Sequence, residues 1–329
     1  MARRYVNQFR DGDTLDEIYL ASDKQLKVNK KGDTYLQVEL RDRTGSIVAR
    51  MWNVGDAVFR SFENGDYLQI EGKVQLFQGA IQLILSHIER AEMKHVDVRE
   101  FLPRTEHDIG KLTERLRNLL LNLGNPHLRG LAESFLGDAD FMAGFIACPA
   151  GVRMHHAYVG GLLEHTVTMM EVAERLVPIY PGVDRELLLV GIFLHDCGKI
   201  RELSYTKSFG YTDEGQLIGH IPLAIEMLAA HAAGVPELTG EPIPRELLAR
   251  IRHMILSHHG TLEHGSPKVP MTPEAELLHL IDALDTRMHQ TLREIRDDQQ
   301  SQTAWTTYSP ATGRKIFKGS ASGPTDFAD

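Results

Sequence analysis

Residues 187–200 read LLLVGIFLHDCGKI, an apolar run that ends in a histidine–aspartate doublet and then Gly198–Lys199. The run 187–193 predicts the buried part of a helix, and the glycine predicts its end. His195 and Asp196 are therefore expected at the inner end of a buried helix. Polar side chains in such a place need partners, which other parts of the chain have to supply.

The chain has 329 residues, of which 42% are apolar and 25% charged, as expected for a soluble globular protein of two domains. No apolar run approaches the roughly 18 residues of a membrane span, and the N-terminus lacks the apolar region of a signal peptide. Two cysteines, Cys148 and Cys197, form no disulfide framework. We therefore expect a cytoplasmic protein without membrane contact.

The net charge of −9 is distributed unevenly along the chain. Residues 1–95 carry equal numbers of basic and acidic side chains, so residues 96–329 account for the whole excess. All but one of the 16 histidines lie from His95 onward. Bulk charge therefore gives no sign of a nucleic-acid partner, whereas an acidic, histidine-rich half suits a cation site.

Residues 12–90 alternate between apolar and polar side chains, as half-buried strands do. A short helix is expected within 54–65. The predicted strands are 17–28, 34–42, 46–52, 66–77 and 80–89. This order is typical of a five-stranded OB-fold barrel, which binds nucleic acid through strands 2 and 3 and the loops beside them. We assign residues 1–95 to a nucleic-acid-binding OB-fold domain and the charged residues 96–107 to a linker.

Single strands are held by stacked aromatic side chains and a basic path. Lysines at 24, 27, 30 and 31 cluster around the first interstrand loop. The alternatives are ordinary loop lysines and aromatic side chains that fill the barrel core. The candidate nucleic-acid contacts in this domain are Lys30, Lys31, Tyr35, Trp52 and Phe77.

From residue 108 the apolar spacing becomes three to four residues, which predicts an all-helical domain over 108–298. The tail, 299–329, is polar, and its last dozen residues are expected to be disordered. The fold class is therefore a β barrel followed by an all-α domain. The predicted helices are 108–123, 159–177, 184–196, 219–233, 244–259 and 273–298.

Five histidines and two aspartates fall at the ends or on the inward faces of these helices. Their separations equal about one helix plus a connection, so successive helices can each supply ligands to one centre. Imidazole and carboxylate ligands without cysteine suit divalent Mn, Fe, Co, Ni or Zn better than a structural zinc site. Hydrogen-bonded core histidines are the alternative, but they explain a single residue better than a set. The set is His165, His195, Asp196, His220, His258, His259 and Asp282.

Asp196 is placed to bridge two ions, with His195 binding one of them. Two such ions can activate a water and hold the oxygens of a phosphodiester. Lys199, on the same helix end, is expected to reach the phosphate as negative charge accumulates there. The predicted chemistry is phosphodiester hydrolysis, with Asp196 and Lys199 as the catalytic residues.

These motifs resemble the HD-domain phosphohydrolases. The stretches HHAYVGGLLEHT (155–166), YTDEGQLIGHI (211–221) and LHLIDALD (278–285) are similar to the YhaM-type 3′→5′ exoribonucleases, which also place an OB-fold before the HD domain. Cys197 stands where Ile or Leu is more usual, and a small apolar thiol fits that place.

The resemblance implies two divalent ions per chain, with Mn the expected metal. Asp285, one turn after Asp282, remains an alternative ligand. The matching ligands are His165, His195, Asp196 and Asp282 for the first ion, and His220, His258 and His259 for the second. Arg153, His155 and His156 precede the helix of His165 and are expected to meet substrate phosphates, although the two histidines could instead cap that helix.

The implied activity is shortening of single-stranded RNA from its 3′ end, with single-stranded DNA as a second candidate substrate. A hydrolase of nucleotides or cyclic dinucleotides is the next interpretation. It is disfavoured because IREL follows Lys199 in place of the glycine–tyrosine–proline motif of cyclic-dinucleotide hydrolases. A non-catalytic nucleic-acid-binding factor is disfavoured by the complete ligand set. The tail residues 304–319 could pack on a neighbouring subunit of a homo-oligomer.

Overall fold

The computed structural model describes residues 3–29, 32–77, 80–152, 156–205, 209–298, 303–310 and 312–319. The chain forms two compact units that meet in sequence between Arg104 and Thr105. The first unit is built mainly from the residues before this point and also includes Ser204–Gly210, and the rest of the chain after this point forms the second unit.

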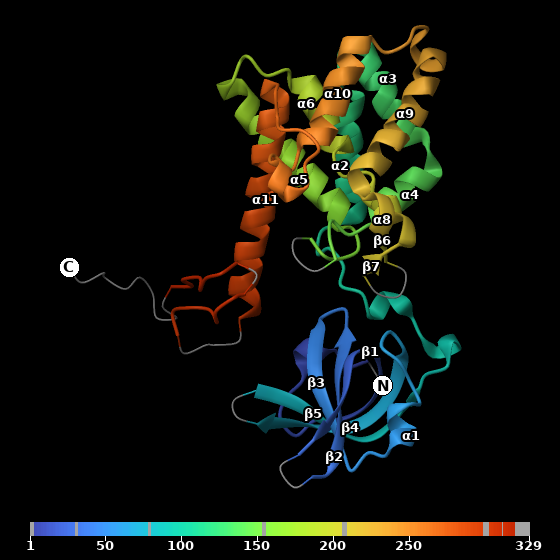
Figure 1. Cartoon of the computed structure of the whole chain (residues 1–329), viewed down its shortest axis with the longest axis vertical. Helices are drawn as coiled ribbons and strands as arrows, with labels where there is room; N and C mark the ends of the chain where they lie inside the picture. The colour runs from blue at the N-terminus through green and yellow to red at the C-terminus, as the bar shows by residue number, and fades with distance from the viewer. Residues whose placement is uncertain are drawn as a thin grey trace, which may run out of the picture. The chain divides into compact units, whose positions relative to one another are not determined.

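The first unit is a closed barrel with the strand order β1-β2-β3-β5-β4, in which β1 also pairs with β4 (Figure 1). Strands β3 and β5 are parallel, and the other pairs are antiparallel. A short helix, α1 (Asp56–Phe59), connects β3 to β4. The predicted barrel is confirmed. The strands are β1 (Thr14–Val28), β2 (Thr34–Asp42), β3 (Gly45–Trp52), β4 (Tyr67–Phe77) and β5 (Ala80–Arg90).

Alternation along the strands builds the barrel core. Leu36, Val38 and Leu40 of β2 point inward and are fully buried, whereas the residues between them reach the outer face. Beyond β5 the chain stays attached to the barrel, because Phe101 is buried against Tyr67 with ring centroids 4.8 Å apart. Part of the segment predicted as a charged linker therefore packs as a small apolar cluster on the barrel.

The second unit is a helical bundle around α6, whose residues 187–194 are all buried. Helix α6 packs against α3, α5, α10 and α11 (Figure 1). Two further helices, α3 and α4, were not predicted. The main helices are α2 (Ile109–Leu121), α3 (Pro126–Gly137), α4 (Ala139–Ala147), α5 (Gly161–Leu176), α6 (Arg185–Leu194), α9 (His220–Thr239), α10 (Arg245–Ser257) and α11 (Pro273–Asp297). Shorter elements are α7 (Lys199–Glu202), β6 (Leu203–Ser204), β7 (Gly210–Tyr211) and α8 (Asp213–Ile218).

The start of α6 is fixed by carboxylates from two helices. Asp184 caps the helix by accepting hydrogen bonds from the backbone N–H groups of Glu186 and Leu187. The backbone N–H of Asp184 donates in turn to the buried carboxylate of Glu274, at 2.9 Å, and Arg250 lies 3.0 Å from the other oxygen of Glu274. These contacts tie α6 to α10 and α11, which both carry parts of the site described below.

Helix α9 is long and apolar enough to cross a membrane by length and composition alone, with a mean hydropathy of 1.2. This differs from the expectation that no stretch approaches such a length. The helix packs on α3 and α10, and its His231 ring stacks on Phe135 with a centroid distance of 3.7 Å. Its first residue, His220, belongs to the polar cluster described next.

Candidate metal centre

Two histidines of the cluster sit immediately after the last turn of a helix and are held in the same way. His195 follows α6 and donates from Nδ1 to the carbonyl oxygen of Ile192 at 2.7 Å. His258 follows α10 and donates from Nδ1 to the carbonyl oxygen of Ile255, also at 2.7 Å. A carbonyl can only accept, so Nδ1 carries the proton in both rings. Each Nε2 is left as a lone-pair donor that points into the bundle.

Two further histidines are oriented by carboxylates. Nδ1 of His165, in α5, lies 2.6 Å from Oδ2 of Asp285. Nδ1 of His220 lies 3.1 Å from Oε1 of Glu202, which also accepts the His220 backbone N–H at 3.0 Å. An outer acceptor of this kind fixes the tautomer and the ring direction of a metal-binding histidine.

His259 completes the pattern, because its Nδ1 lies 3.1 Å from the carbonyl oxygen of His264. All five histidines of the predicted set therefore have an acceptor at Nδ1. Among the described residues, three groups have possible ligand atoms that all lie within 4.8 Å of one another: two contain only predicted ligands, and the third is His156, His165 and Asp285. The two groups of predicted ligands are His165, His195 and Asp282, and His220, His258 and His259.

Asp196 lies between the two groups and turns one oxygen toward each. Its Oδ2 is 3.4 Å from Nε2 of His195 and 3.9 Å from Nε2 of His165. Its Oδ1 is 3.5 Å from Nε2 of His220 and 3.6 Å from Nε2 of His258. The carboxylate is 3% exposed, so both oxygens face protein rather than bulk solvent. This is the arrangement expected of a carboxylate shared by two cations.

Buried atoms in this cluster lack hydrogen-bond partners among the described residues. They are Nε2 of His195, His220 and His258 and Oδ1 of Asp196. An unsatisfied buried polar atom is costly, and natural structures contain few of them. Several converging on one centre, all of them lone-pair donors, fit divalent cations of the Mn to Zn series. The donor set contains no thiolate: both cysteines are buried, and burial raises the pKa of each thiol.

The charge states of the imidazoles agree with this assignment. Burial lowers the pKa of His258, and burial together with the neighbouring His258 lowers the pKa of His259 to about 4. These rings are therefore neutral at pH 7 and able to ligate. Burial alone would lower the pKa of His165, but Asp282 and Asp285 outweigh it and raise the pKa to about 9. Without a cation, His165 carries the positive charge that these carboxylates require.

Lys199 makes its closest contact with the carboxylate of Asp196. Its Nζ donates to Asp196 Oδ2 at 2.6 Å and to the carbonyl oxygen of Ala150 at 2.7 Å. Burial alone would raise the pKa of Asp196, but Lys199 and His195 outweigh it and hold that pKa well below its usual range. Asp196 therefore stays ionised, as a bridging ligand must. The role of Lys199 in binding phosphate stays a prediction.

The two candidate aspartates of α11 occupy different places. Oδ1 of Asp282 is 3.4 Å from Nε2 of His165, on the side of the cluster. Asp285 approaches the other ring nitrogen of His165 and also lies 2.9 Å from Nε2 of His156. The geometry favours Asp282 as the ligand and Asp285 as the group that positions His165.

The prediction that His156 contacts substrate phosphates is corrected by its position. The residue is 2% exposed, and its Nδ1 lies 2.6 Å from the hydroxyl of Tyr158. Its ring also stacks on His289, with centroids 3.9 Å apart. His156 therefore holds Asp285 in place inside the bundle and does not lie on a surface that substrate could reach. It also does not cap α5, whose N-cap is Gly160. Arg153 and His155 lie outside the described residues.

Two glycines allow the close approaches that the cluster needs. A Cβ on Gly198 would lie 2.0 Å from the carbonyl oxygen of His220, so a side chain there would push α9 away. Gly260 has φ +82°, and a Cβ on it would lie 2.3 Å from the ring of His279. Nδ1 of His279 lies 2.8 Å from the carbonyl oxygen of His258, so this ring braces the turn that carries two ligands.

On the barrel, the predicted aromatic contacts lie at the surface. Tyr35 is half-buried and Trp52 is 46% exposed, and their rings pack with centroids 4.9 Å apart. Lys27 is paired with Tyr35, and Tyr35 with Trp52, so the three lie side by side on β1, β2 and β3. Phe77, at the end of β4, is 50% exposed. These positions suit stacking with bases and disfavour the alternative of barrel-core residues.

The lysines predicted around the first interstrand loop do not form one open basic surface among the described residues. Lys24 does not belong to an open basic surface, because its side chain is 6% exposed and its Nζ donates to the carbonyl oxygen of Phe59 at 3.0 Å. Lys30 and Lys31 lie outside the described residues.

Three supporting residues were absent from the predicted set. His279 lies one turn before Asp282 on a predicted helix, so helical spacing could have found it. Glu202 reaches His220 across the fold, and Tyr158 reaches His156 within an irregular segment. No sequence period links either pair.

Comparison with known proteins agrees with this architecture. A family profile described as an HD domain matches residues 162–287, and one described as an OB-fold nucleic acid binding domain matches residues 22–91. The two halves of the chain thus define a hydrolase of the HD class with a nucleic-acid-binding barrel.

Individual relatives narrow this class. A protein of Oceanobacillus iheyensis named 3′-5′ exoribonuclease YhaM is 33% identical over 289 residues, 88% of this chain and 89% of its own length. Proteins of the same name from Bacillus subtilis and a Geobacillus species are 32% and 33% identical. They cover 86% and 90% of this chain, and 88% and 89% of their own lengths. The chain belongs to the YhaM family of exoribonucleases.

Family membership confirms the resemblance given by the HD and OB-fold motifs, and with it the prediction of a hydrolytic nuclease. A nucleic-acid substrate follows from the same relatives and from the OB-fold profile. The predicted ligand residues are brought together by the fold but are not individually tested by these comparisons. The cytoplasmic location stays a prediction.

Proposed function

We propose that this protein is a two-metal 3′→5′ exoribonuclease that shortens single-stranded RNA, with Mn²⁺ as its working ion. The observation that carries the proposal is the position of Asp196, which turns one buried oxygen toward each of two groups of ligand atoms. The names of the relatives support the substrate and the direction.

The residues present would hold two ions in adjoining places. His165, His195 and Asp282 would bind the first, His220, His258 and His259 the second, and Asp196 both. Bound ions of this kind supply Lewis acidity for a phosphodiester and a water that deprotonates near neutral pH. The outer acceptors at each Nδ1 fix the tautomer and the direction of the five imidazole rings, so that each Nε2 faces the centre.

Lys199 is the cationic side chain of this chain's own that is best placed to meet a substrate phosphate. Burial alone would lower the pKa of Lys199, but Asp196 outweighs it and raises the pKa, so the ammonium persists at neutral pH. The group is preorganised by the carbonyl of Ala150 at 2.7 Å, which limits its reorganisation during the reaction. It can hold a non-bridging phosphate oxygen while the ester bond breaks.

The barrel is proposed to retain the RNA strand between successive cleavages. The tilted pair of Tyr35 and Trp52 offers an aromatic surface for bases, and Lys27 lies next to it across the strands. Stacking on aromatic rings is tolerant of sequence, as a general exonuclease requires. We expect Trp52→Ala to weaken RNA binding by roughly 5- to 150-fold without changing metal binding.

Incubation with Mn²⁺ and 5′-labelled single-stranded RNA tests the activity. A ladder of shortened labelled products is expected. Direct release of a labelled mononucleotide would instead indicate the opposite direction. Asp196→Ala should abolish the ladder, whereas Glu246→Gln, at the exposed start of α10, should leave it intact. Intact RNA with hydrolysed free nucleotides would overturn the proposal in favour of a nucleotide hydrolase. A parallel single-stranded DNA substrate measures the preference between the two strands.

A further inference from the structure

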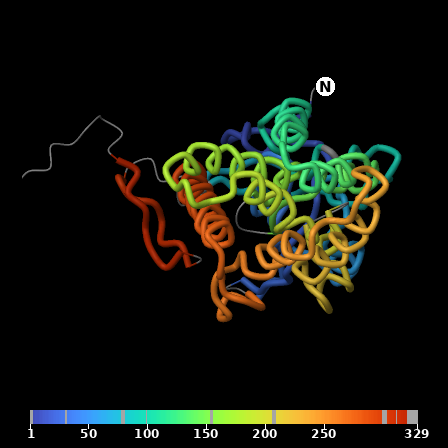
Figure 2. The backbone as a smooth tube through the Cα atoms, turned by 90° about the horizontal axis from the view of Figure 1, so that it is seen from above, coloured from blue at the N-terminus to red at the C-terminus, as the bar shows by residue number. Residues whose placement is uncertain are grey.

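Beyond α11 the chain folds back into a small two-stranded hairpin. Trp305 is bridged to Phe317, and Ser309 to Arg314, in antiparallel fashion. Backbone hydrogen bonds reinforce it, with the N–H of Thr306 donating to Ile316 at 2.9 Å and the N–H of Lys318 donating to Ala304 at 2.7 Å. Figure 2 shows this C-terminal hairpin at the margin of the helical unit, beside α11. The hairpin therefore has one face against the helix and one face away from it.

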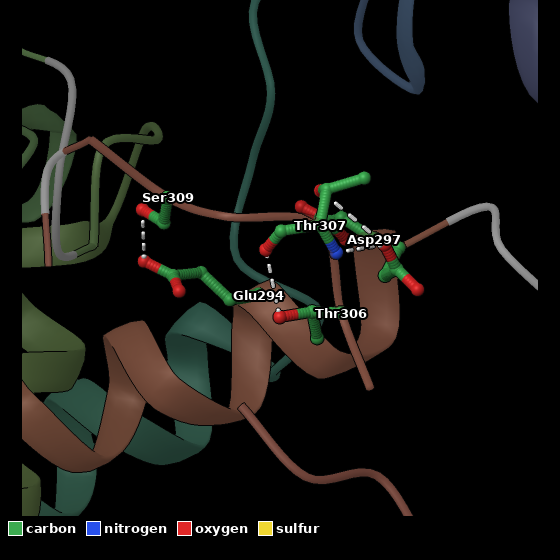
Figure 3. A pocket seen from close by; sticks show the side chains of 6 residues that line it. Glu294, Asp297, Thr306, Thr307 and Ser309 are labelled. Atoms are coloured by element: carbon green, nitrogen blue, oxygen red, sulfur yellow. Dashed lines mark hydrogen bonds between the residues drawn. The ribbon is translucent and has the colours of Figure 1, made fainter. Parts of the chain in front are cut away.

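The inner face is anchored to the end of α11. Ser309 donates from Oγ to Glu294 at 3.0 Å, and the backbone N–H of Thr307 donates to Asp298 at 3.1 Å. These residues surround a cavity of about 270 Å³ (Figure 3). The carboxylates that line the cavity all have partners, since Asp297 pairs with Arg293 at 3.2 Å. The cavity lies more than two helical turns beyond Asp285, so the polar residues that line it hold the hairpin on α11 and are not part of the metal cluster.

The outer face is aromatic. Thr306 is buried against the helix, so its neighbour Trp305 points outward, and Phe317 lies opposite Trp305 across the hairpin. Trp305 is 49% and Phe317 42% exposed, and their ring centroids are 5.1 Å apart. Large aromatic rings held rigidly with half their surface in solvent are suited to a planar partner.

The hairpin is also basic within an acidic half of the chain. Residues 303–319 contain three basic side chains and no acidic one. Lys318 is paired with Asp298 on the inner side. Arg314 and Lys315 are exposed and make no ion pair with any described residue. Lys315 lies two residues before Phe317 in the chain, and both side chains are exposed. A cation thus flanks the aromatic pair.

We propose that the outer face of the C-terminal hairpin, formed by Trp305, Phe317 and Lys315, is a second binding site for single-stranded nucleic acid, separate from the barrel. Bases stack on the aromatic pair while Lys315 contacts phosphates. The inference rests on the proposed function only in taking a single strand as the substrate.

Charge and chemistry favour a nucleic acid over a second copy of this chain as the occupant. The exposed cations would repel the same face of another copy in a symmetric contact, whereas they attract a polyanion. The exposed apolar residues of α11, such as Leu292, are aliphatic and lie outside the hairpin. Self-association through the tail is the competing outcome of the test.

The test measures binding without cleavage. The full chain, freed of metal with EDTA, is titrated against a 5′-fluorescein oligo(A) 20-mer by anisotropy. Trp305→Ala is expected to weaken binding by roughly 5- to 150-fold, and Trp305→Phe to restore most of it. Lys315→Ala should reduce the slope of log affinity against log salt by about 0.7. Leu292→Ala and Arg252→Ala, at exposed positions of α11 and α10, should change neither quantity.

A direct reporter is available because the chain has only two tryptophans, Trp52 and Trp305. In a Trp52→Phe chain, oligo(A) should quench the remaining emission. Unchanged affinity in both Trp305→Ala and Lys315→Ala, together with no quenching, overturns the proposal. If Trp305→Ala sediments as a smaller particle than the parent protein but binds RNA with unchanged affinity, the hairpin serves self-association, and the proposal of a second nucleic-acid site is overturned. The proposed function would fail in a different experiment, the absence of Mn²⁺-dependent RNA shortening by the parent protein. The two failures can be distinguished because the titrations contain no metal.

Discussion

Replacing Asp285 with asparagine tests how the fold positions a metal ligand. Oδ2 of Asp285 accepts from Nδ1 of His165 at 2.6 Å and lies 2.9 Å from Nε2 of His156. Asparagine keeps one carbonyl oxygen but removes the charge that holds both rings. Loss of such an outer partner typically weakens metal binding by roughly 10- to 100-fold. At about 1.4 kcal/mol per tenfold change, this is about 1.4 to 2.7 kcal/mol.

Isothermal titration of the metal-free chain with MnCl₂ measures the effect. In Asp285→Asn, the site containing His165 should weaken by the stated factor, while the site containing His220 should not. Glu202→Gln should produce the reverse, because Glu202 holds His220 through two contacts of 3.1 and 3.0 Å. Asp297→Asn, on the same helix as Asp285, is the matched control and should bind both ions normally. Two normal affinities in Asp285→Asn would refute the reasoning.

Three further perturbations have defined outcomes. Lys199→Met should destabilise the metal-free protein by roughly 3–5 kcal/mol in urea unfolding, because it leaves the buried carboxylate of Asp196 without its cation; an unchanged midpoint would contradict this. Gly260→Ala should cost at least about 1–2 kcal/mol in thermal unfolding and weaken Mn²⁺ binding, since φ is +82° and the new Cβ would strike His279. Burial alone would raise the pKa of Glu274, but the backbone N–H of Asp184 and the guanidinium of Arg250 outweigh it and lower that pKa. The stability that these contacts contribute is therefore present above the unfolded pKa near 4.5 and is lost as the pH falls through the folded pKa. Glu274→Gln should therefore lose about 2 kcal/mol at pH 7 and converge with the parent protein in acid; a constant difference down to pH 3 would refute that assignment.

Much of the fold was predictable because local patterns and burial agree. Alternation in 34–42 predicted β2 with its observed bounds, and the apolar run 187–193 predicted the buried α6. Helix α3 was missed although its apolar residues Leu128, Leu131, Ala132, Phe135 and Leu136 follow helical spacing after the cap Asn125, so the sequence could have shown it. Helix α4 was missed because it is short and almost entirely apolar, which leaves no polar face to mark a helical period. The packing of Phe101 on Tyr67 was missed because a single aromatic residue in a charged segment carries no period.

The candidate site was predictable where its residues lie at helix ends. His195 and His258 could be placed because each follows an apolar helical run. Spacing alone could not separate Asp282 from Asp285, which lie on one helix face; distances to the two nitrogens of His165 do separate them. The buried position of His156 was not predictable, because His156 itself has φ +44° and lies in an irregular segment, where no sequence period applies.

Anomalous diffraction from crystals grown with Mn²⁺ tests the two-metal assignment most directly. We expect two peaks in each chain, one beside His165, His195 and Asp282 and the other beside His220, His258 and His259. Both peaks should lie within coordination distance of Asp196, and both should disappear in Asp196→Ala. A single peak, or two peaks that Asp196 does not join, would contradict the two-metal assignment.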